Sequence, residues 1–237
     1  MPTANGVEES SGRIRVLLAE DHPIVRYGLR RLLEREPDLE VCCEAGDVPS
    51  VLKGIEEARP DMVILDVSLH GHSGVELMKD IKARRPGLPV LLLSMHDEGM
   101  YAERALRAGA KGYIMKDQTP EEVLAAIRKV LRGGIYLSEK MAGRMVQQAV
   151  SGIRLQAASP VERLSDREIE VFEFIGRGTS TREIAEALHL SVKTVETHKA
   201  HIKEKMGLAH TQELLLHGIQ WLHERDGGVH PPACGRV

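Results

Sequence analysis

The chain has 237 residues, which is enough for two domains with separate hydrophobic cores. Its 32 Lys and Arg residues nearly balance its 35 Asp and Glu residues, so the overall charge does not indicate a nucleic-acid partner. No apolar run approaches the roughly 18 residues that cross a membrane, and the start lacks the pattern of a secretory signal. The three cysteines show neither metal-ligand nor disulfide spacing, which fits a reducing cytoplasm.

Strand-like and helix-like segments alternate in the first part of the chain. Short runs of Val, Ile and Leu bounded by turn or helix signals suit parallel strands that are buried on both faces, so we predict a doubly wound α/β sheet. Five strands are expected, at Ile14–Ala19, Leu39–Cys43, Met62–Asp66, Val90–Ser94 and Gly112–Met115. Amphipathic helices are expected at Val25–Arg35, Val48–Arg59, Gly74–Arg85, Tyr101–Ala108 and Glu121–Arg132.

After Gly133 the periodicity changes and only helical signals remain. Four helices are expected in the last part, beginning after Ser165, after Ser180 or Thr181, after Ser191 and at Thr211. The predicted divisions are a disordered extension at 1–13, an α/β domain at 14–132, a linker at 133–160 with a helix at 138–150, an all-α four-helix domain at 161–225 and a disordered tail at 226–237.

Side chains that can bind a metal or a phosphate stand at the ends of four predicted strands. They are Asp21 with its neighbour Glu20, Asp66, Ser94 and Lys116. Ligand sites of parallel sheets lie just outside the carboxyl ends of the strands, so we expect these groups to converge. Carboxylate oxygens suit Mg²⁺, Asp66 can act as a nucleophile toward phosphorus, and Lys116 can neutralise phosphoryl oxygens. The pattern predicts aspartyl-phosphate chemistry assisted by Mg²⁺.

Residues 14–132 resemble the receiver domain of bacterial two-component response regulators, through the motifs LLAED, VILDVSL, LLLSMHDE and AGAKGYIMKD. The resemblance implies a flavodoxin-like strand order, 2-1-3-4-5. It also implies Mg²⁺ ligands from Glu20, Asp21, Asp66 and the backbone carbonyl of Ser68. Asp66 would accept a phosphoryl group from a partner sensor histidine kinase. Ser94 would then move toward the phosphate, and Tyr113 would switch from an outward to an inward rotamer.

Three histidines near these motifs carry further expectations. His96 follows Ser94 by two residues, where receivers tune the lifetime of the phosphoryl group, so we expect it to shield the phosphate or orient water. Receivers usually have Pro at the position of His70, so the loop after Asp66 is expected to be less rigid. His70 and His72 could form a metal site, but the pattern offers no third ligand, and solvated histidines are the preferred interpretation.

The pattern between Ser180 and Met206 is helix, tight turn, helix, which is the arrangement that places a second helix in the DNA major groove. Helical periodicity places Val192, Val195, Ile202 and Met206 on the core side of that helix. Helix starts at Ser180, Thr181 and Ser191 offer backbone N–H groups to phosphates. The charge is indecisive, because residues 160–237 carry 10 basic against 12 acidic side chains, whereas 191–206 carry four Lys against two Glu.

Residues 164–208 look like a DNA-binding domain of the LuxR type, through EIA at 183–185, SVKTVETH at 191–198 and the closing KMGL. Combined with a receiver, this is the layout of the NarL/FixJ class of response regulators. The resemblance implies base contacts from Glu196, Thr197 and Ala200. It implies phosphate contacts from Lys193, Thr194, Lys199 and Lys203.

The last predicted helix has more apolar surface than one small core can bury. In the NarL/FixJ class this helix forms the dimer contact, so we expect a homodimer in the active state, through Leu215, Ile219 and Leu222. A dimer would match two DNA half-sites about one helical turn apart. A terminal helix that is simply packed deeply within one subunit remains the alternative.

The combined prediction is a cytoplasmic transcription regulator without a metabolic activity, in which phosphorylation of Asp66 by a histidine kinase controls dimerisation and binding to double-stranded promoter DNA. A phosphatase-type enzyme is one alternative, but it would need a second Asp at position 68, which is Ser. A DNA-binding protein with a degenerate receiver is the other. The complete acid pair and Lys116 argue against it.

Overall fold

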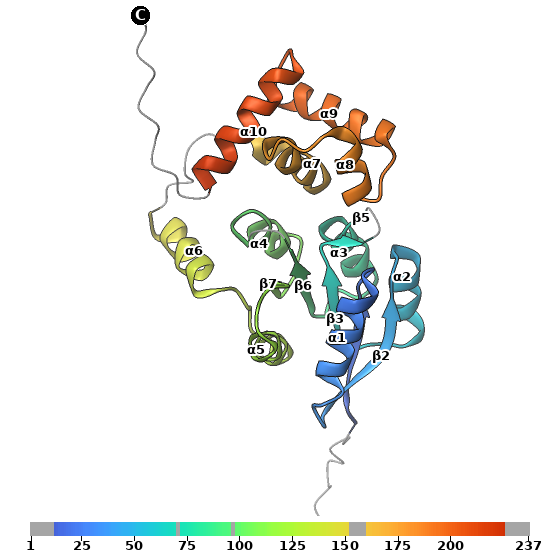
Figure 1. Ribbon diagram of the computed structural model, residues 1–237. Helices are drawn as coiled ribbons and strands as arrows, with labels where there is room; N and C mark the ends of the chain where they lie inside the picture. Colours follow the sequence, from blue (N-terminus) through green and yellow to red (C-terminus); the bar gives the residue numbers. More distant parts are fainter. Residues whose placement is uncertain (1–11, 70–71, 96–97, 152–159, 226–237) are drawn as a thin grey trace, which may run out of the picture. The chain divides into compact units, whose positions relative to one another are not determined.

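The computed structural model describes residues 12–69, 72–95, 98–151 and 160–225 (Figure 1). The chain divides into two structural units, Met1–Met145 and Val146–Val237, and the division falls within helix α6 (Glu139–Ser151). Across the described ranges, no helix has both the length and the apolar character that a bilayer crossing requires.

The first unit is built on a five-stranded sheet. Its strands are β1 (Ile14–Ala19), β2 (Leu39–Ala45), β3 (Met62–Asp66), β6 (Val90–Ser94) and β7 (Gly112–Met115). The strand order is β2-β1-β3-β6-β7, and every neighbouring pair is parallel. The predicted doubly wound α/β fold and its order 2-1-3-4-5 are therefore confirmed. Strand β2 runs two residues beyond its predicted end.

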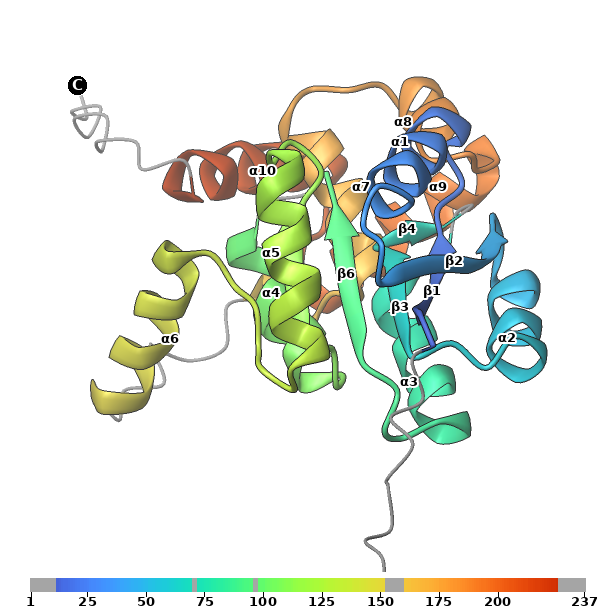
Figure 2. The same cartoon turned by 90° about the horizontal axis from the view of Figure 1, so that it is seen from below.

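Helices connect the strands of this sheet. They are α1 (Pro23–Leu33), α2 (Val48–Glu57), α3 (Gly74–Arg84), α4 (Glu98–Arg107) and α5 (Pro120–Leu131). Right-handed crossovers between parallel strands place helices on both faces of the sheet, and Figure 2 shows α1 and α3 on opposite sides of β1 and β3. Asp47 and Thr119 cap α2 and α5 through their side chains, and Thr119 forms a complete capping box with Glu122.

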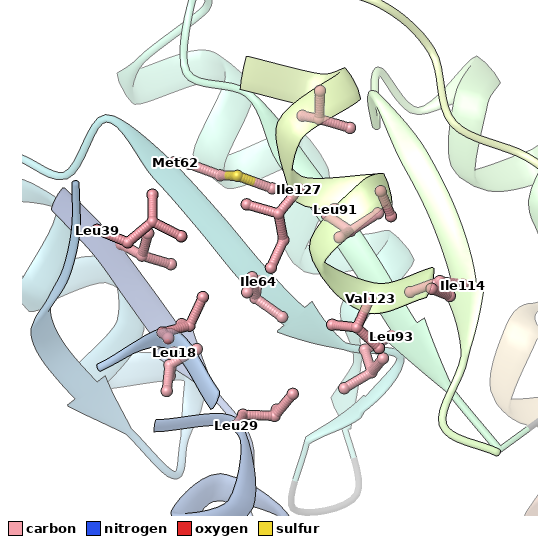
Figure 3. Packing of buried hydrophobic residues seen from close by; sticks show 14 residues of the cluster. Leu18, Leu29, Leu39, Met62, Ile64, Leu91, Leu93, Ile114, Val123 and Ile127 are labelled. Carbon is pink, nitrogen blue, oxygen red and sulfur yellow. The ribbon is translucent and has the colours of Figure 1, made fainter. Parts of the chain in front are cut away.

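The core on one face of the sheet alternates along the strands, as the two-residue period of a strand requires (Figure 3). It contains Val16 and Leu18 of β1, Met62 and Ile64 of β3, and Leu91 and Leu93 of β6. These pack against helices α1 and α5, which contribute Leu29, Leu33, Val123, Ala126, Ile127 and Val130. This packing fixes which side chains of each strand point to this face of the sheet. Because the strands are parallel, all of them end at the same carboxyl edge.

The second unit is helical. It contains the short 3₁₀ helix η1 (Pro160–Arg163), α7 (Asp166–Gly176), α8 (Thr181–Ala187), α9 (Val192–Met206) and α10 (Thr211–Arg225). The four predicted helices are confirmed. Ser165, Ser180 and Ser191 are their N-caps, as expected, and Gly207 ends α9 in the left-handed conformation, with φ of 70°.

Helices α7 and α10 approach closely where two glycines face each other. A Cβ atom added to Gly176 would lie 2.6 Å from the carbonyl oxygen of Gly218, so only glycine fits there. The ring centroids of Phe172 and Trp221 are 5.4 Å apart at the same contact. Phe172 is fully buried, and this pair of helices forms the centre of the helical core.

The predicted core side of α9 is correct for Val195 and Ile202, which are fully buried. The prediction for Val192 is wrong, because its side chain is 47 % exposed. Val192 is the first residue of α9, and the packing that covers Val195 one turn further along does not reach it.

Candidate functional site

The carboxyl edge of the sheet brings the predicted acidic and basic side chains together. Glu20 and Asp21 follow β1, Asp66 ends the central strand β3, and Lys116 follows β7. Lys116 Nζ lies 2.7 Å from Asp66 Oδ2 and 2.7 Å from Glu20 Oε2. These three side chains are at most 6 % exposed, so the ion pairs are buried. One ammonium group thus joins two carboxylates from different strands.

A divalent cation fits this edge on the basis of its charge and its ligand atoms. One oxygen or nitrogen from each of Glu20, Asp21, His22 and Asp66 lies within 4.8 Å of all the others. The three carboxylates outnumber the single cation of Lys116, which leaves the buried cluster negative. Carboxylate oxygens at this density are the donors that hard divalent ions prefer. His22 was not among the predicted site residues, although it directly follows the acid pair.

The surroundings of Asp66 place its pKa near neutral pH, so its protonation changes with small changes in pH. Burial, opposed by Lys116 and aided by the nearby Glu20, raises the pKa of Asp66 to about 7. Burial lowers the pKa of Lys116, but the attraction of Asp66 and Glu20 outweighs burial and raises that pKa above its usual value. Below about pH 7, Asp66 takes up a proton in the metal-free site and loses the negative charge that binding a cation or attacking phosphorus would require.

A short hairpin that was not predicted shapes the chain after Asp66. Its strands are β4 (Ser68–Leu69) and β5 (His72–Ser73). The Ser68 N–H donates to Asp66 Oδ1 at 3.2 Å, which orients the carboxylate. A Cβ atom at Gly74 would lie 2.3 Å from the Asp66 carbonyl oxygen, so the return of the hairpin requires glycine there. Strands of two residues are too short to show a periodic pattern in the sequence. Gly74 is the sequence feature that could have indicated this close return of the chain to Asp66.

The other predicted receiver residues take different positions. Ser94 is fully buried at the end of β6, and its carbonyl oxygen accepts from the Lys116 N–H at 2.7 Å, which ties the ends of β6 and β7 together. Tyr113, on β7, is fully buried. His70 and His96 lie outside the described residues. His72 is exposed and does not belong to the metal-capable group found among the described residues.

In the helical unit, α8 and α9 present the predicted DNA-contacting residues. Lys193, Glu196, Thr197 and Ala200 are exposed, and Thr194, Lys199 and Lys203 are half-buried. The hydroxyl of Thr181 donates to Glu196 at 2.9 Å, and Lys199 Nζ donates to both Thr181 and Glu196, at 3.0 and 2.9 Å. The hydrogen bond from Lys199 lowers the pKa of Glu196. This network links the start of α8 to the exposed face of α9.

The basic character of α9 is partly neutralised. Lys205 Nζ lies 2.6 Å from Glu168 Oε2 on α7, so its charge is paired within the unit. Helical periodicity could not predict this ion pair, because Lys205 and Glu168 are 37 positions apart and lie on different helices. Of the two lysines besides Lys199 that were predicted to contact phosphates, Lys193 is exposed and Lys203 is half-buried.

Helix α10 exposes only part of its apolar surface. Leu215, Leu216 and Ile219 are 38 %, 66 % and 48 % exposed, whereas Leu214 is fully buried. Leu222, which was predicted to form a dimer contact together with Leu215 and Ile219, is less exposed than these two residues. It is half-buried, and its Cδ1 lies 2.8 Å from where a Cβ of Gly176 would stand, so this side chain packs on α7.

Comparison with known proteins agrees with both units. The family model of the response regulator receiver domain matches residues 16–128, and that of the bacterial regulatory proteins of the luxR family matches 162–217. The chain is 36 % identical to the oxygen regulatory protein NreC of Staphylococcus aureus over 211 residues, which are 87 % of this chain and 97 % of the relative.

The similar solved structures include two further response regulators. A two-component response regulator of the LuxR family from Aurantimonas sp. SI85-9A1 has 35 % identity and a TM-score of 0.55, covering 59 % of this chain and 99 % of that one. RcsB from Salmonella enterica serovar Typhimurium, bound to promoter rprA with the phosphomimetic BeF₃⁻, has 26 % identity and a TM-score of 0.55, covering 86 % and 97 %. The chain is therefore a DNA-binding transcription regulator that belongs to the two-component response regulators of the NarL/FixJ class, with a receiver followed by a LuxR-type helix-turn-helix domain.

Proposed function

We propose that Asp66 accepts a phosphoryl group from a partner sensor histidine kinase and that this modification controls dimerisation and promoter binding in the cytoplasm, where the promoter DNA is. The observation that carries the proposal is the joint pairing of Lys116 with Asp66 and Glu20 at one buried edge. This arrangement holds a nucleophilic carboxylate beside a fixed cation and a group of acidic metal ligands.

The transfer needs few chemical parts. A carboxylate oxygen of Asp66 forms the new P–O bond as the P–N bond to the kinase histidine breaks and the imidazole leaves. Glu20, Asp21, Asp66 and the Ser68 carbonyl would hold Mg²⁺, which would supply positive charge to neutralise the phosphoryl oxygens. Lys116 Nζ is already beside Asp66, so it can move from the carboxylate to a phosphoryl oxygen with little displacement. The hydroxyl of Ser94 would bind another phosphoryl oxygen, and His96 would shield the phosphate or orient water.

The receiver responds to the phosphoryl group by favouring one of two arrangements. Only contacts that differ between the two arrangements can shift their populations. We assign this change to Ser94, at the end of β6, and to Tyr113, within the neighbouring strand β7. The hydrogen bond from the Lys116 N–H to the Ser94 carbonyl joins the end of β6 to the residue that follows β7.

For DNA binding, α9 would lie in the major groove, with Glu196, Thr197 and Ala200 toward the bases. The phosphate-binding side chains would be Lys193, Thr194, Lys199 and Lys203, together with the starts of helices at Ser180 and Thr181. Support comes from exposure of the base-facing residues and from the similar RcsB structure, which contains promoter DNA. The exposed Leu215 and Ile219 would form the dimer contact, and Leu222 would contribute through its uncovered part.

The receiver proposal is tested by intact-mass spectrometry after incubation with acetyl phosphate and Mg²⁺. The wild-type chain should gain the mass of one phosphoryl group, and Asp66→Asn should gain none, because the amide is not a nucleophile of this kind. Asp117→Asn is the matched control, since it removes an exposed acid beside Lys116 and should behave as the wild type does.

Two results would contradict this account. An adduct that persists in Asp66→Asn would place the acceptor elsewhere. A wild-type chain that gains no phosphoryl group from acetyl phosphate or from its kinase would favour the degenerate receiver, which binds DNA without this control.

A further inference from the structure

Glu196, on the exposed side of α9, has one carboxylate oxygen held by the rest of the helical unit. Its Oε1 accepts hydrogen bonds from the Thr181 hydroxyl and from Lys199 Nζ, both at 2.9 Å. Lys199 Nζ also donates to the Thr181 oxygen at 3.0 Å, so the three side chains form a closed triangle of hydrogen bonds. Thr181 is the first residue of α8, and Lys199 lies three positions beyond Glu196 on α9. The triangle therefore fixes the carboxylate from two helices.

The second carboxylate oxygen is left for a partner outside the unit. Of the residues that the structure describes, none forms a hydrogen bond or an ion pair with Glu196 Oε2. The Glu196 side chain is 55 % exposed, whereas that of Lys199 is 15 % exposed, so the carboxylate is held from its inner side and remains accessible. The hydrogen bond from Lys199 lowers the pKa of Glu196, so the carboxylate stays ionised at neutral pH and can only accept hydrogen bonds.

The four bases differ in what they offer to such an acceptor in the major groove. Guanine presents acceptors at O6 and N7, and thymine presents the O4 acceptor, so both repel a carboxylate oxygen. Adenine offers its N6 amine, but the N7 acceptor lies beside it. Cytosine offers its N4 amine without a neighbouring acceptor on the same base. A fixed, ionised carboxylate therefore favours cytosine over the other three bases.

We propose that Glu196 Oε2 selects a cytosine in each DNA half-site by accepting a hydrogen bond from its N4 amine, and that Thr181 and Lys199 are positioning residues for this contact. The proposal rests on the function proposed above, in which α9 lies in the major groove, and it adds which base Glu196 reads. Prior fixation of Oε1 reduces the rotamer freedom that Glu196 loses on binding. Lys199 uses two of its three donors in the triangle, so the third is left for the phosphate contact that we assign to it.

A competing explanation gives the triangle only a structural role. In that case the three side chains would link α8 to α9 and stabilise the helical unit, while Oε2 would remain solvated in the complex with DNA. A change of Glu196 would then alter stability without altering which base pair is preferred. Base preference at one position of the half-site is the observable that separates the two explanations.

The experiment selects binding sites from random-sequence duplex DNA with the full-length chain, both untreated and treated with acetyl phosphate and Mg²⁺. The use of both states keeps the result independent of the control by Asp66. The affinity for the selected duplex is then measured with each of the four base pairs at the position of the cytosine. The variants are Glu196→Gln, Thr181→Val and Thr181→Ser. Glu204→Gln is the matched control, because it makes the same change at an exposed glutamate further along α9.

We expect the wild-type chain and Glu204→Gln to prefer the C·G pair by roughly 5- to 150-fold. In Glu196→Gln the preference should move to A·T at the same position, because an amide pairs with both N6 and N7 of adenine. Thr181→Val should lower the cytosine preference roughly two- to tenfold by removing one hydrogen bond to Oε1. Thr181→Ser keeps the hydroxyl and should preserve the preference.

A cytosine preference that Glu196→Gln leaves unchanged would overturn the proposal, and equal preferences in Thr181→Val and the wild type would overturn the positioning role of Thr181. Lys193→Met then shows how far such a failure extends. If this variant weakens binding to all sequences about equally, α9 contacts DNA and the proposed function stands. If it has no effect, the proposed DNA contacts of α9 fail together with the base reading by Glu196.

Discussion

Lys116→Met is expected to destabilise the metal-free receiver strongly and to increase the stabilisation that Mg²⁺ provides. Lys116 is the cation that pairs with both Asp66 and Glu20, and its side chain is 6 % exposed. Removing one partner of a buried ion pair leaves the other charge uncompensated, which lowers the free energy of unfolding by about 3–5 kcal/mol. Mg²⁺ supplies the missing positive charge, so its binding should restore much of this stability.

The measurement is urea unfolding followed by circular dichroism, with EDTA and then with Mg²⁺. The loss should be larger above about pH 7 than below it, because burial raises the pKa of Asp66 to about 7 and a protonated carboxyl needs no counter-charge. Lys111→Met, which changes an exposed lysine just before β7, is the control and should have little effect. An equal loss of stability with and without Mg²⁺ would show that Lys116 does not share the site with the metal.

Phe172→Ala is expected to unfold the helical unit at temperatures at which the receiver stays folded. Phe172 is fully buried where α7 meets α10, and truncating a buried Phe lowers the free energy of unfolding by about 3–5 kcal/mol. A domain of this small size has little stability in reserve. Trp221, the only Trp of the chain, is 5.4 Å from the Phe172 ring, so its fluorescence reports this unit selectively.

Thermal unfolding followed by Trp221 fluorescence should therefore show a much lower midpoint in Phe172→Ala, while the phosphoryl adduct on Asp66 still forms. Phe174 is the only other Phe of the chain and is half-buried, so Phe174→Ala should shift the midpoint less. Loss of the adduct together with the fluorescence transition would mean that the two units do not fold separately.

Much of the sheet was predictable, because its signals are local. The continuous apolar runs of β1, β3 and β6, and the capping residues Asp47 and Thr119, each lie within or beside the element that they define. The convergence of Asp66 and Lys116 was also predictable, although they are 50 positions apart. A parallel sheet places every strand end on one edge, so the topology supplies the long-range information.

Other features depend on pairs that no local pattern records. The contact of Lys199 with Thr181 and the pairing of Lys205 with Glu168 follow from how the helices pack. Leu222 packs on α7 because α7 and α10 cross closely at Gly176, and helical periodicity alone does not reveal this crossing. His22 was overlooked for another reason: a histidine before Pro suggests a turn, and only its distances to Glu20 and Asp21 place it beside the acid pair.

The central claim is that the state of Asp66 controls DNA binding, and footprinting on genomic DNA tests it most directly. The wild-type chain and Asp66→Asn would be compared with and without acetyl phosphate and Mg²⁺. The account predicts that phosphorylation raises the affinity of the wild-type chain by roughly 5- to 150-fold at discrete sites. Those sites should contain two half-sites about one helical turn apart. Asp66→Asn should show no increase. Equal occupancy of the same sites in all four samples would contradict the account.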